Sequence, residues 1–176
     1  MIPFRKQNDE VLYPASKHVE FAVEDIQQLK KMADKNPRGR IRLCAHQNLN
    51  DVVHEMIIVH RGDCYVRPHR HMTRDESIYV IEGEADLVIF NDDGLIRQVV
   101  AIGDITSNAT LFCKIAANTI HTLLFKTRHL VFKEVTQGPF DCASVFFPTW
   151  APTEEDPSVH FYLQELISMT KKLRDK

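Results

Sequence analysis

The chain has 176 residues, of which 44% are hydrophobic and 26% are charged, and its formal net charge is -2. This composition is typical of one globular domain, and it lacks the basic excess that a dedicated nucleic-acid-binding protein needs. No apolar run reaches the roughly eighteen residues of a membrane span, and residues 1–10 contain no apolar signal segment, so we expect a soluble cytoplasmic protein that binds neither nucleic acid nor membrane.

The two ends of the chain are predicted to flank a single central domain, which spans residues 20–155. Residues 1–19 read as a loosely held arm with room for one short strand. A helix over residues 23–35 opens the domain, because Ile26, Leu29 and Ala33 recur at helical spacing and Asn36-Pro37 stops the pattern. An amphipathic helix over residues 160–172 closes the chain, in a segment 156–176 that packs on or beside the domain.

Short strands separated by polar turns fill the middle of the chain. The predicted strands are 41–46, 54–60, 65–69, 76–81, 85–90, 96–102, 110–115, 119–126 and 130–135. Strands of this length and spacing indicate a β-sandwich or a β-barrel.

Three histidines and one glutamate form a candidate metal site. His69 and His71 are two residues apart, so they share one face of a strand. Glu76 opens the next strand, which can fold back beside the first, and His121 follows from a distant strand. Such a set suits one divalent ion, which can be zinc, iron, manganese, nickel or copper. The alternative is a pair of surface histidines in a loop beside an unrelated acid.

The same residues resemble the two motifs of the cupin superfamily. The first motif corresponds to Gly62, His69, His71, Glu76 and Gly83, and the second to Gly103, Asn118 and His121. The second motif departs from the usual pattern, with Ala116 in place of proline, Asn118 in place of glycine and Phe125 in place of asparagine. The resemblance implies a mostly β protein, a cupin jelly-roll β-barrel with an N-terminal and a C-terminal helix.

Residues 20–155 resemble more narrowly the WbuC family of cupin-fold metalloproteins. The resembling segments are Pro37-Arg38-Gly39-Arg40, His46, Tyr65 to His71, and the tail from Glu134 through Gly138-Pro139-Phe140 to Trp150-Ala151-Pro152. That family is named for a gene of bacterial surface-polysaccharide clusters, which leaves its reaction open. The cupin resemblance also implies a homodimer that pairs through sheet edges.

Three further residues are candidates for substrate binding and catalysis. Tyr65 and Arg67 share the strand parity of His69 and His71, so both are predicted to face the barrel interior. There Arg67 either binds an anionic group of the substrate or forms a structural salt bridge. If Thr127-Arg128 is a two-residue hairpin turn, Glu134 lies opposite His121 and is a catalytic general base or orients a metal ligand. The alternative is an edge-strand glutamate in water.

Other polar residues are given less specific interpretations. The alternating Arg38, Arg40 and Arg42 are either a solvated strand face or a contact for an anion or a partner. The remaining histidines of interest lack ligand spacing and are interpreted as surface or hydrogen-bonded residues; these are His46, His54, His60, His129 and His160. The four cysteines are expected to be reduced and mostly buried, with no nearby histidine to activate Cys64 or Cys113.

Three functions remain open from the sequence. The first is a metal-dependent isomerase or epimerase that acts on a sugar or sugar-nucleotide in bacterial surface-polysaccharide biosynthesis. The second is a metal-dependent dioxygenase, which the ligand set alone supports. The third is a non-enzymatic module that binds a metal or a small ligand. In each case the expected partner is a small molecule, such as an anionic sugar derivative.

Overall fold

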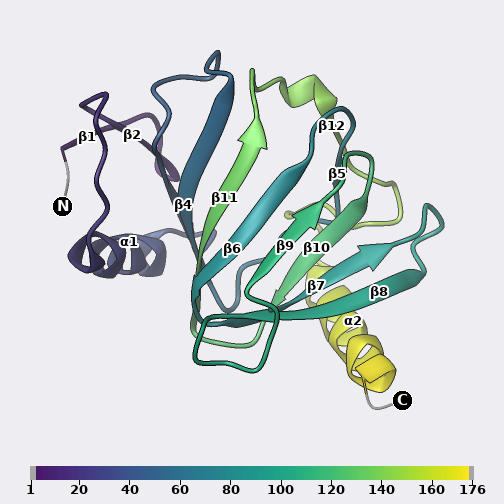
Figure 1. The fold of residues 1–176 in the computed structure, drawn as a ribbon. Helices are drawn as coiled ribbons and strands as arrows, with labels where there is room; N and C mark the ends of the chain where they lie inside the picture. The colour runs from purple at the N-terminus through teal and green to yellow at the C-terminus, as the bar shows by residue number, and fades with distance from the viewer. Residues whose placement is uncertain (1–2, 175–176) are drawn as a thin grey trace.

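The structure, a computed structural model, describes residues 3–174 as a mostly β fold with two helices (Figure 1). In chain order the elements are β1 (Phe4–Lys6), β2 (Val11–Pro14), α1 (Val23–Lys35), β3 (Arg40–Cys44), β4 (Val53–Arg61), β5 (Arg70–His71), β6 (Glu76–Glu82), β7 (Glu84–Phe90), β8 (Ile96–Gly103), β9 (Phe112–Ile115), β10 (Ile120–Phe125), β11 (His129–Gln137), a short 3-10 helix η1 (Cys142–Ser144), β12 (Val145–Phe146) and α2 (Val159–Arg174).

The strands form a large sheet, a small sheet and a two-stranded ribbon. The seven-stranded sheet has the order β1-β2-β3-β4-β11-β6-β9, the three-stranded sheet β10-β7-β8, and the ribbon pairs β12 with β5. Neighbours are antiparallel except β2 and β3, which run parallel. Across residues 3–174 these sheets remain separate hydrogen-bonded ladders, so a closed barrel is not observed.

The core lies in three layers, one between the sheets and one beneath each helix. Between the sheets, Ile58, Ile78 and Phe132 of the large sheet meet Leu87 and Leu123 of the small one. Because both faces of the central strand β4 are covered, its residues from Met56 to His60 are all buried instead of alternating with exposed ones.

Each helix covers the outer face of one sheet. Leu29 and Ala33 of α1 pack on the large sheet against Leu43 and Val59. Leu166 of α2 packs on the small sheet in a cluster with other apolar side chains; these include Val88, Phe90, Ile120 and Leu124. Figure 1 shows the two helices at opposite sides of the molecule, with α2 beside β7 and β8. The predicted helix over 23–35 and the predicted C-terminal helix are confirmed.

The N-terminal arm is more ordered than its composition indicates. Residues 4–6 and 11–14 form a hairpin that extends the large sheet through β3. Leu12 is fully buried under α1, and Tyr13 is buried on the other face, so this short segment is held by packing on both sides. The prediction of a loosely held arm was therefore wrong, and the arm contains two short strands.

Two pairing predictions were also wrong. Residues 65–68 are not a strand, and β6 does not fold back beside them, since it pairs with β9 and β11. In addition, β10 and β11 do not form a hairpin: β10 pairs with β7 in the small sheet, whereas β11 pairs with β4 and β6 in the large one. The turn at Thr127-Arg128 thus carries the chain from one sheet to the other.

Gly83 marks the corresponding turn between β6 and β7. Its φ is +91°, and an added Cβ would lie 2.3 Å from the carbonyl oxygen of His129. Only glycine fits this close approach at a positive φ. Within the described residues, no helix is long and apolar enough to span a membrane.

Candidate functional site

The large sheet and the small sheet enclose a cavity of about 780 Å³. Alternate residues of each strand face it, as the two-residue repeat of a strand requires. Its wall includes His54, Met56, Ile58 and His60 of β4, Phe132, Glu134 and Thr136 of β11, Glu76 and Ile78 of β6, and His121 and Leu123 of β10. Residues from both sheets thus converge on one cavity, which is open on one side to solvent.

The four predicted metal ligands come together at this cavity. His71 Nε2 lies 2.9 Å from Oε2 of Glu76, and His121 Nε2 lies 2.7 Å from its Oε1. The ring of His69 lies 4.7 Å from that of His121 and 5.3 Å from that of His71, centre to centre. One buried carboxylate is therefore shared by two imidazoles, with a third beside them.

Backbone pairing explains how these residues meet. His69 and His121 form an isolated bridge, in which each backbone N–H donates to the carbonyl of the other residue at 3.1 and 2.9 Å. His69 and His71 therefore belong to the wall made by β10, whereas Glu76 reaches the cluster from β6 in the large sheet. The site is closed by approach of the two sheets, and not by the adjacent strands that the sequence suggests.

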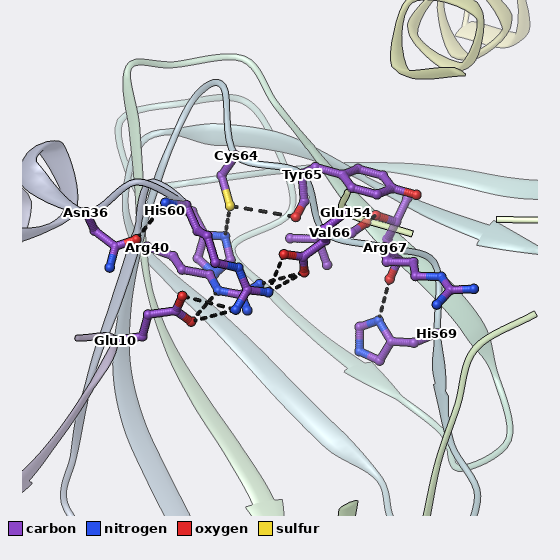
Figure 2. A network of polar contacts seen from close by, with 12 residues as sticks. Glu10, Asn36, Arg40, His60, Cys64, Tyr65, Val66, Arg67, His69 and Glu154 are labelled. Atoms are coloured by element: carbon purple, nitrogen blue, oxygen red, sulfur yellow. Dashed lines mark hydrogen bonds and ion pairs between the residues drawn. The ribbon is translucent and has the colours of Figure 1, made fainter. Parts of the chain in front are cut away.

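Hydrogen bonds orient two of the imidazoles. Nδ1 of His69 lies 2.9 Å from the carbonyl oxygen of Arg67 (Figure 2), and Nδ1 of His121 lies 2.9 Å from that of Thr119. A carbonyl only accepts, so each Nδ1 carries a proton and donates it. In the neutral ring the lone pair is then on Nε2, which is the arrangement that metal-ligating histidines adopt.

The His121–Glu76 contact requires a cation between or on its partners. If His121 were neutral, Nε2 and the carboxylate oxygen would both be acceptors at 2.7 Å. Burial opposes charge on His121, but the Glu76 carboxylate outweighs it and raises the pKa of His121 above its usual value. Burial alone would raise the pKa of Glu76, yet His121 and the other imidazoles hold it well below its usual range. Either a proton or a metal ion would satisfy this pair, and imidazole nitrogen with carboxylate oxygen is a donor set that divalent cations accept.

The ring proton of His71 is placed less favourably for metal binding than the ring protons of His69 and His121. Its Nδ1 faces Nη2 of Arg74 at 3.5 Å, and a guanidinium only donates, so the proton of neutral His71 sits on Nε2. Donor atoms in a tetrahedral site lie about 3.4 Å apart, farther than the Glu76 contacts. Within residues 3–174, accordingly, no three His, Cys, Asp or Glu side chains form a ready metal site. Ligation by all four residues requires the Glu76 contacts to lengthen.

Burial also sets the charge of His69. Removal from water, reinforced by His121, lowers the pKa of His69 to about 3. The ring is therefore neutral across the physiological pH range, which is the form that can ligate a metal.

Glu134 lines the same cavity, although the reason given by the sequence was wrong. Its strand partners are Met56 and Ile78, and His121 is on the other sheet. Both residues line the cavity, and their charges interact there. Burial and the nearby Glu76 charge raise the pKa of Glu134 to about 7, against the opposing effect of Arg42 and His121. A carboxyl group with such a pKa can both accept and donate a proton at neutral pH.

Arg67 and Tyr65 are held by the tail that follows β12. Nε and Nη2 of Arg67 donate to the carbonyls of Ala151 and Pro148 at 3.2 and 3.4 Å, and its guanidinium lies 5.0 Å from the ring centre of Phe147. Arg67 lines the cavity, but Tyr65 does not. The Tyr65 hydroxyl donates to Pro152 O at 3.0 Å, beside a separate hollow of about 660 Å³.

The arginines around β3 divide into paired and unpaired ones. Arg38 Nη1 and Arg40 Nε contact the Glu10 carboxylate at 3.0 and 2.7 Å, and both arginines also contact Glu154 of the tail (Figure 2). Arg42, two residues along the strand, lines the cavity and has no side-chain hydrogen bond or ion pair with any residue of the described chain. Neither sequence interpretation, solvated face or partner contact, describes Arg38 and Arg40, which tie the arm to the tail.

Sequence reasoning missed several buried polar residues of the cavity. His46 and His54 are buried and stacked, with ring centres 4.0 Å apart. His60 is also buried, and its Nδ1 lies 3.3 Å from Sγ of Cys64, a contact that the sequence spacing did not indicate. Burial lowers the pKa of His60 to about 3 and raises the pKa of the Cys64 thiol to about 12, so this contact does not activate the thiol. The alternation of histidines at 54 and 60 with apolar residues was the available signal.

Comparison with known sequences gives a partial family match. Residues 21–102 match a family described as a domain of unknown function, DUF6016. This segment contains His69, His71 and Glu76, and it ends before His121 and Glu134. No match was found among curated proteins. The WbuC assignment therefore stays a prediction.

Comparison with solved structures supports the fold. The crystal structure of protein SO0799 from Shewanella oneidensis has a TM-score of 0.52 and 11% identity, and the match covers 64% of this chain and 75% of that one. A Klebsiella pneumoniae protein with a double-stranded β-helix domain has a TM-score of 0.47 and 16% identity, covering 66% and 93%. The capsular polysaccharide assembling protein CapF from Staphylococcus aureus has a TM-score of 0.46 and 13% identity, covering 56% and 27%. At these identities, the likeness to the Shewanella protein indicates a shared fold and nothing finer.

Proposed function

We propose that the chain is a cupin that uses a divalent metal and an acid of the cavity wall to move a proton on an anionic sugar derivative, as an isomerase or an epimerase. One observation carries this proposal. The Glu76 carboxylate, shared by His71 and His121, lies on the wall of the same cavity as Glu134, whose pKa is about 7. A candidate cation site and a proton-transfer group therefore line one cavity, as isomerisation next to a carbonyl group requires.

Each residue has a role in this proposal. His69, His71, His121 and Glu76 would hold the ion, which when bound would polarise a carbonyl oxygen of the ligand. Glu134 would take the proton from the adjacent carbon and return it to the neighbouring carbon on the same face, while the hydroxyl proton passes from one ligand oxygen to the other. Epimerisation would require a second donor to deliver a proton to the opposite face. Neither reaction needs an oxidant or reductant, because Glu134 is regenerated in its original form.

The cavity provides the environment that such chemistry needs. Its apolar wall, which includes Ile58, Leu123 and Phe132, keeps the local dielectric low and strengthens the field of every charged group. A volume of about 780 Å³ falls in the range of small-molecule binding sites. The bacterial surface-polysaccharide context is the part of the proposal that rests on the WbuC resemblance alone.

The test has two steps that separate an enzyme from a binding module. First, elemental analysis of purified protein should find one divalent metal per chain. Second, the metal-loaded protein is incubated in D2O with sugar phosphates and nucleotide sugars, and NMR follows deuterium entering carbon positions next to a carbonyl. We expect deuterium incorporation, and Glu134→Gln should slow it by a factor of about 10² or more while keeping the metal.

A matched control is available on the neighbouring strand. Glu55 is also a β-strand glutamate, but it is paired with Lys133 at 2.7 Å and does not line the cavity. Glu55→Gln should leave the exchange unchanged. Metal binding without exchange on any sugar tested would instead identify a non-enzymatic metal-binding module, and oxygen uptake with the loaded protein would identify a dioxygenase.

A further inference from the structure

Arg74 is a buried guanidinium that lacks the partners such a group normally has. It lies between β5 and β6, lines the cavity and is only 5% exposed. Its Nε and Nη1 are buried and make no hydrogen bond, and its Nη2 has only the 3.5 Å contact with His71. No carboxylate of residues 3–174 forms an ion pair with it. Leaving a buried cation without acceptors is costly, so a missing acceptor is indicated.

The surroundings of Arg74 restrict how an acceptor can reach it. The ring of Phe140 covers the planar face, with its centre 4.7 Å from Cζ. An acceptor must therefore approach in the plane of the guanidinium, where two N–H groups can bind one carboxylate or phosphate side by side. Nε and Nη1 also have no contact with solvent. A ligand acceptor at the cavity wall can therefore bind them only if the Arg74 side chain shifts toward it.

A second unpaired guanidinium faces the same space. Arg42 lines the cavity from β3, whereas Arg40 on the same strand is neutralised by Glu10 and Glu154. Six arginines and three glutamates line the cavity in total. Glu154 contacts the paired arginines and Glu76 contacts the imidazoles, so Glu134 is the one glutamate of the described cavity wall without an ion pair; Glu76 and Asp141 act on Arg74 without forming an ion pair with it. The cavity thus has a surplus of positive charge on its large-sheet side.

We propose that Arg74 and Arg42 form an oxyanion-binding subsite, which takes a carboxylate or phosphate group of the cavity ligand. The subsite adjoins Glu134, whose charge interacts with both guanidiniums, and it adjoins His71 through Arg74. A ligand anchored there presents its remaining atoms to Glu134 and to the histidine cluster. The statement about the reacting end of the ligand rests on the proposed function. Anion binding by the subsite can be tested in metal-free protein.

The first test measures the melting temperature. If the subsite exists, removing the charge of Arg74 should stabilise the ligand-free fold and should abolish anion binding. Arg74→Met removes an unpartnered buried charge and keeps most of the side-chain volume. The ligand-free variant should therefore melt at a higher temperature than the wild type. In the same variant, the rise in melting temperature that inorganic phosphate or succinate gives the wild type should disappear. A variant that is less stable and still responds to the anion would show a purely structural role for Arg74 and overturn the proposal.

Affinity gives the second test, by calorimetric titration of metal-free protein with inorganic phosphate and, separately, with succinate. Saturable binding of one anion per chain is expected, and the tighter of the two identifies the ligand group. Arg74→Gln and Arg42→Gln should each weaken binding about tenfold or more, since each removes charge-assisted hydrogen bonds. Arg40→Gln is the matched control on the same strand and should change affinity less than threefold. Equal affinities in wild type and Arg74→Gln, or no saturable binding by folded wild type, would overturn the proposal.

The outcomes also separate this subsite from the proposed function. Anion binding that depends on Arg74 and Arg42, in a protein that binds no metal, would retain the subsite and reject the metal-dependent reaction. Metal bound by the histidines, with neither anion bound, would reject the subsite alone. If Arg74→Gln does not fold, as judged by near-ultraviolet circular dichroism, the Arg42→Gln and Arg40→Gln pair decides the question.

Discussion

Nε2 of His121 and Oε1 of Glu76 lie 2.7 Å apart although the two residues belong to different sheets, β10 and β6. Because Nδ1 of His121 is already bound to a carbonyl, a cation must accompany this pair. The contact therefore depends on the spacing of the two sheets and on the cation that accompanies the pair.

We expect the metal to be lost when a histidine of the cluster is removed. His69→Ala and His121→Ala should each reduce bound metal from one ion per chain to near zero, measured by elemental analysis after dialysis. His160→Ala, on the exposed side of α2, should keep full stoichiometry. Metal affinity should also fall below about pH 6, because protons compete for the imidazoles. Full metal content in His69→Ala would reject the ligand assignment.

The pKa of Glu134 predicts a pH-dependent stability of the metal-free protein. The pKa is about 7 in the folded state and about 4.3 in the unfolded chain, so the folded state binds the proton more tightly. The contribution of Glu134 to the free energy of unfolding is thus greatest below about pH 4 and is lost as the pH rises to about 7, by on the order of 2–3 kcal/mol. The groups that set this pKa are Glu76, Arg42, His121 and Arg74.

Urea unfolding of wild type and Glu134→Gln from pH 5 to pH 8 measures this contribution. The variant should gain stability relative to the wild type as the pH rises, since glutamine cannot lose a proton. Comparing the two proteins at each pH cancels the histidines that titrate in the opposite direction, such as His60. A stability difference that is the same at pH 5 and pH 8 would contradict the prediction.

The ion pairs of Glu154 with Arg38 and Arg40 are expected to hold the tail in place. Glu154→Gln should destabilise the protein by about 1 kcal/mol and speed proteolysis between residues 147 and 157, because these half-buried ion pairs hold the tail against the arm. Limited proteolysis with mass spectrometry of the fragments checks this. Glu155→Gln is the control, because it changes the neighbouring, exposed residue, and a protease should cleave this variant at the wild-type rate.

The expected homodimer points to one sheet edge in particular. Tyr79 and Phe112 are cross-strand partners on β6 and the edge strand β9, and they are 42% and 54% exposed. Exposed aromatic residues beside an unpaired edge favour pairing with a second copy. Light scattering at micromolar concentration should give a dimer, and Phe112→Glu should give a monomer. A monomeric wild type would reject this prediction.

Local features of this fold were predictable because they depend on neighbouring residues. The helix over residues 23–35 follows from apolar spacing and the Asn36-Pro37 stop, and the structure begins and ends it at the same residues. Spacing and motif resemblance also singled out His69, His71, Glu76 and His121, which the structure brings to one cavity, and metal binding by them stays a prediction. They meet because the two sheets approach each other and not because adjacent strands pair as the sequence suggests.

Long-range pairing was not predictable, because strand neighbours depend on the whole topology. The turn at Thr127-Arg128 reads as a hairpin, yet it connects two sheets. Glu134 nevertheless faces the cavity, since it has the parity of Phe132 and Thr136 on β11. Arg74 lies outside any strand, so no periodicity indicated its burial. Polar residues inside a cavity follow from three-dimensional enclosure, which a local pattern does not contain.

The wall of the cavity draws on residues from Arg5 in the arm to Glu154 in the tail. During synthesis, His69, His71 and Glu76 emerge well before His121, and the tail carbonyls that bind Arg67 emerge last. A nascent chain therefore displays an incomplete set of donors for most of its synthesis. If the site binds a metal, loading is expected to follow release from the ribosome, and the composition of the surrounding metal pool at that moment, more than the donor set, would decide which ion is captured.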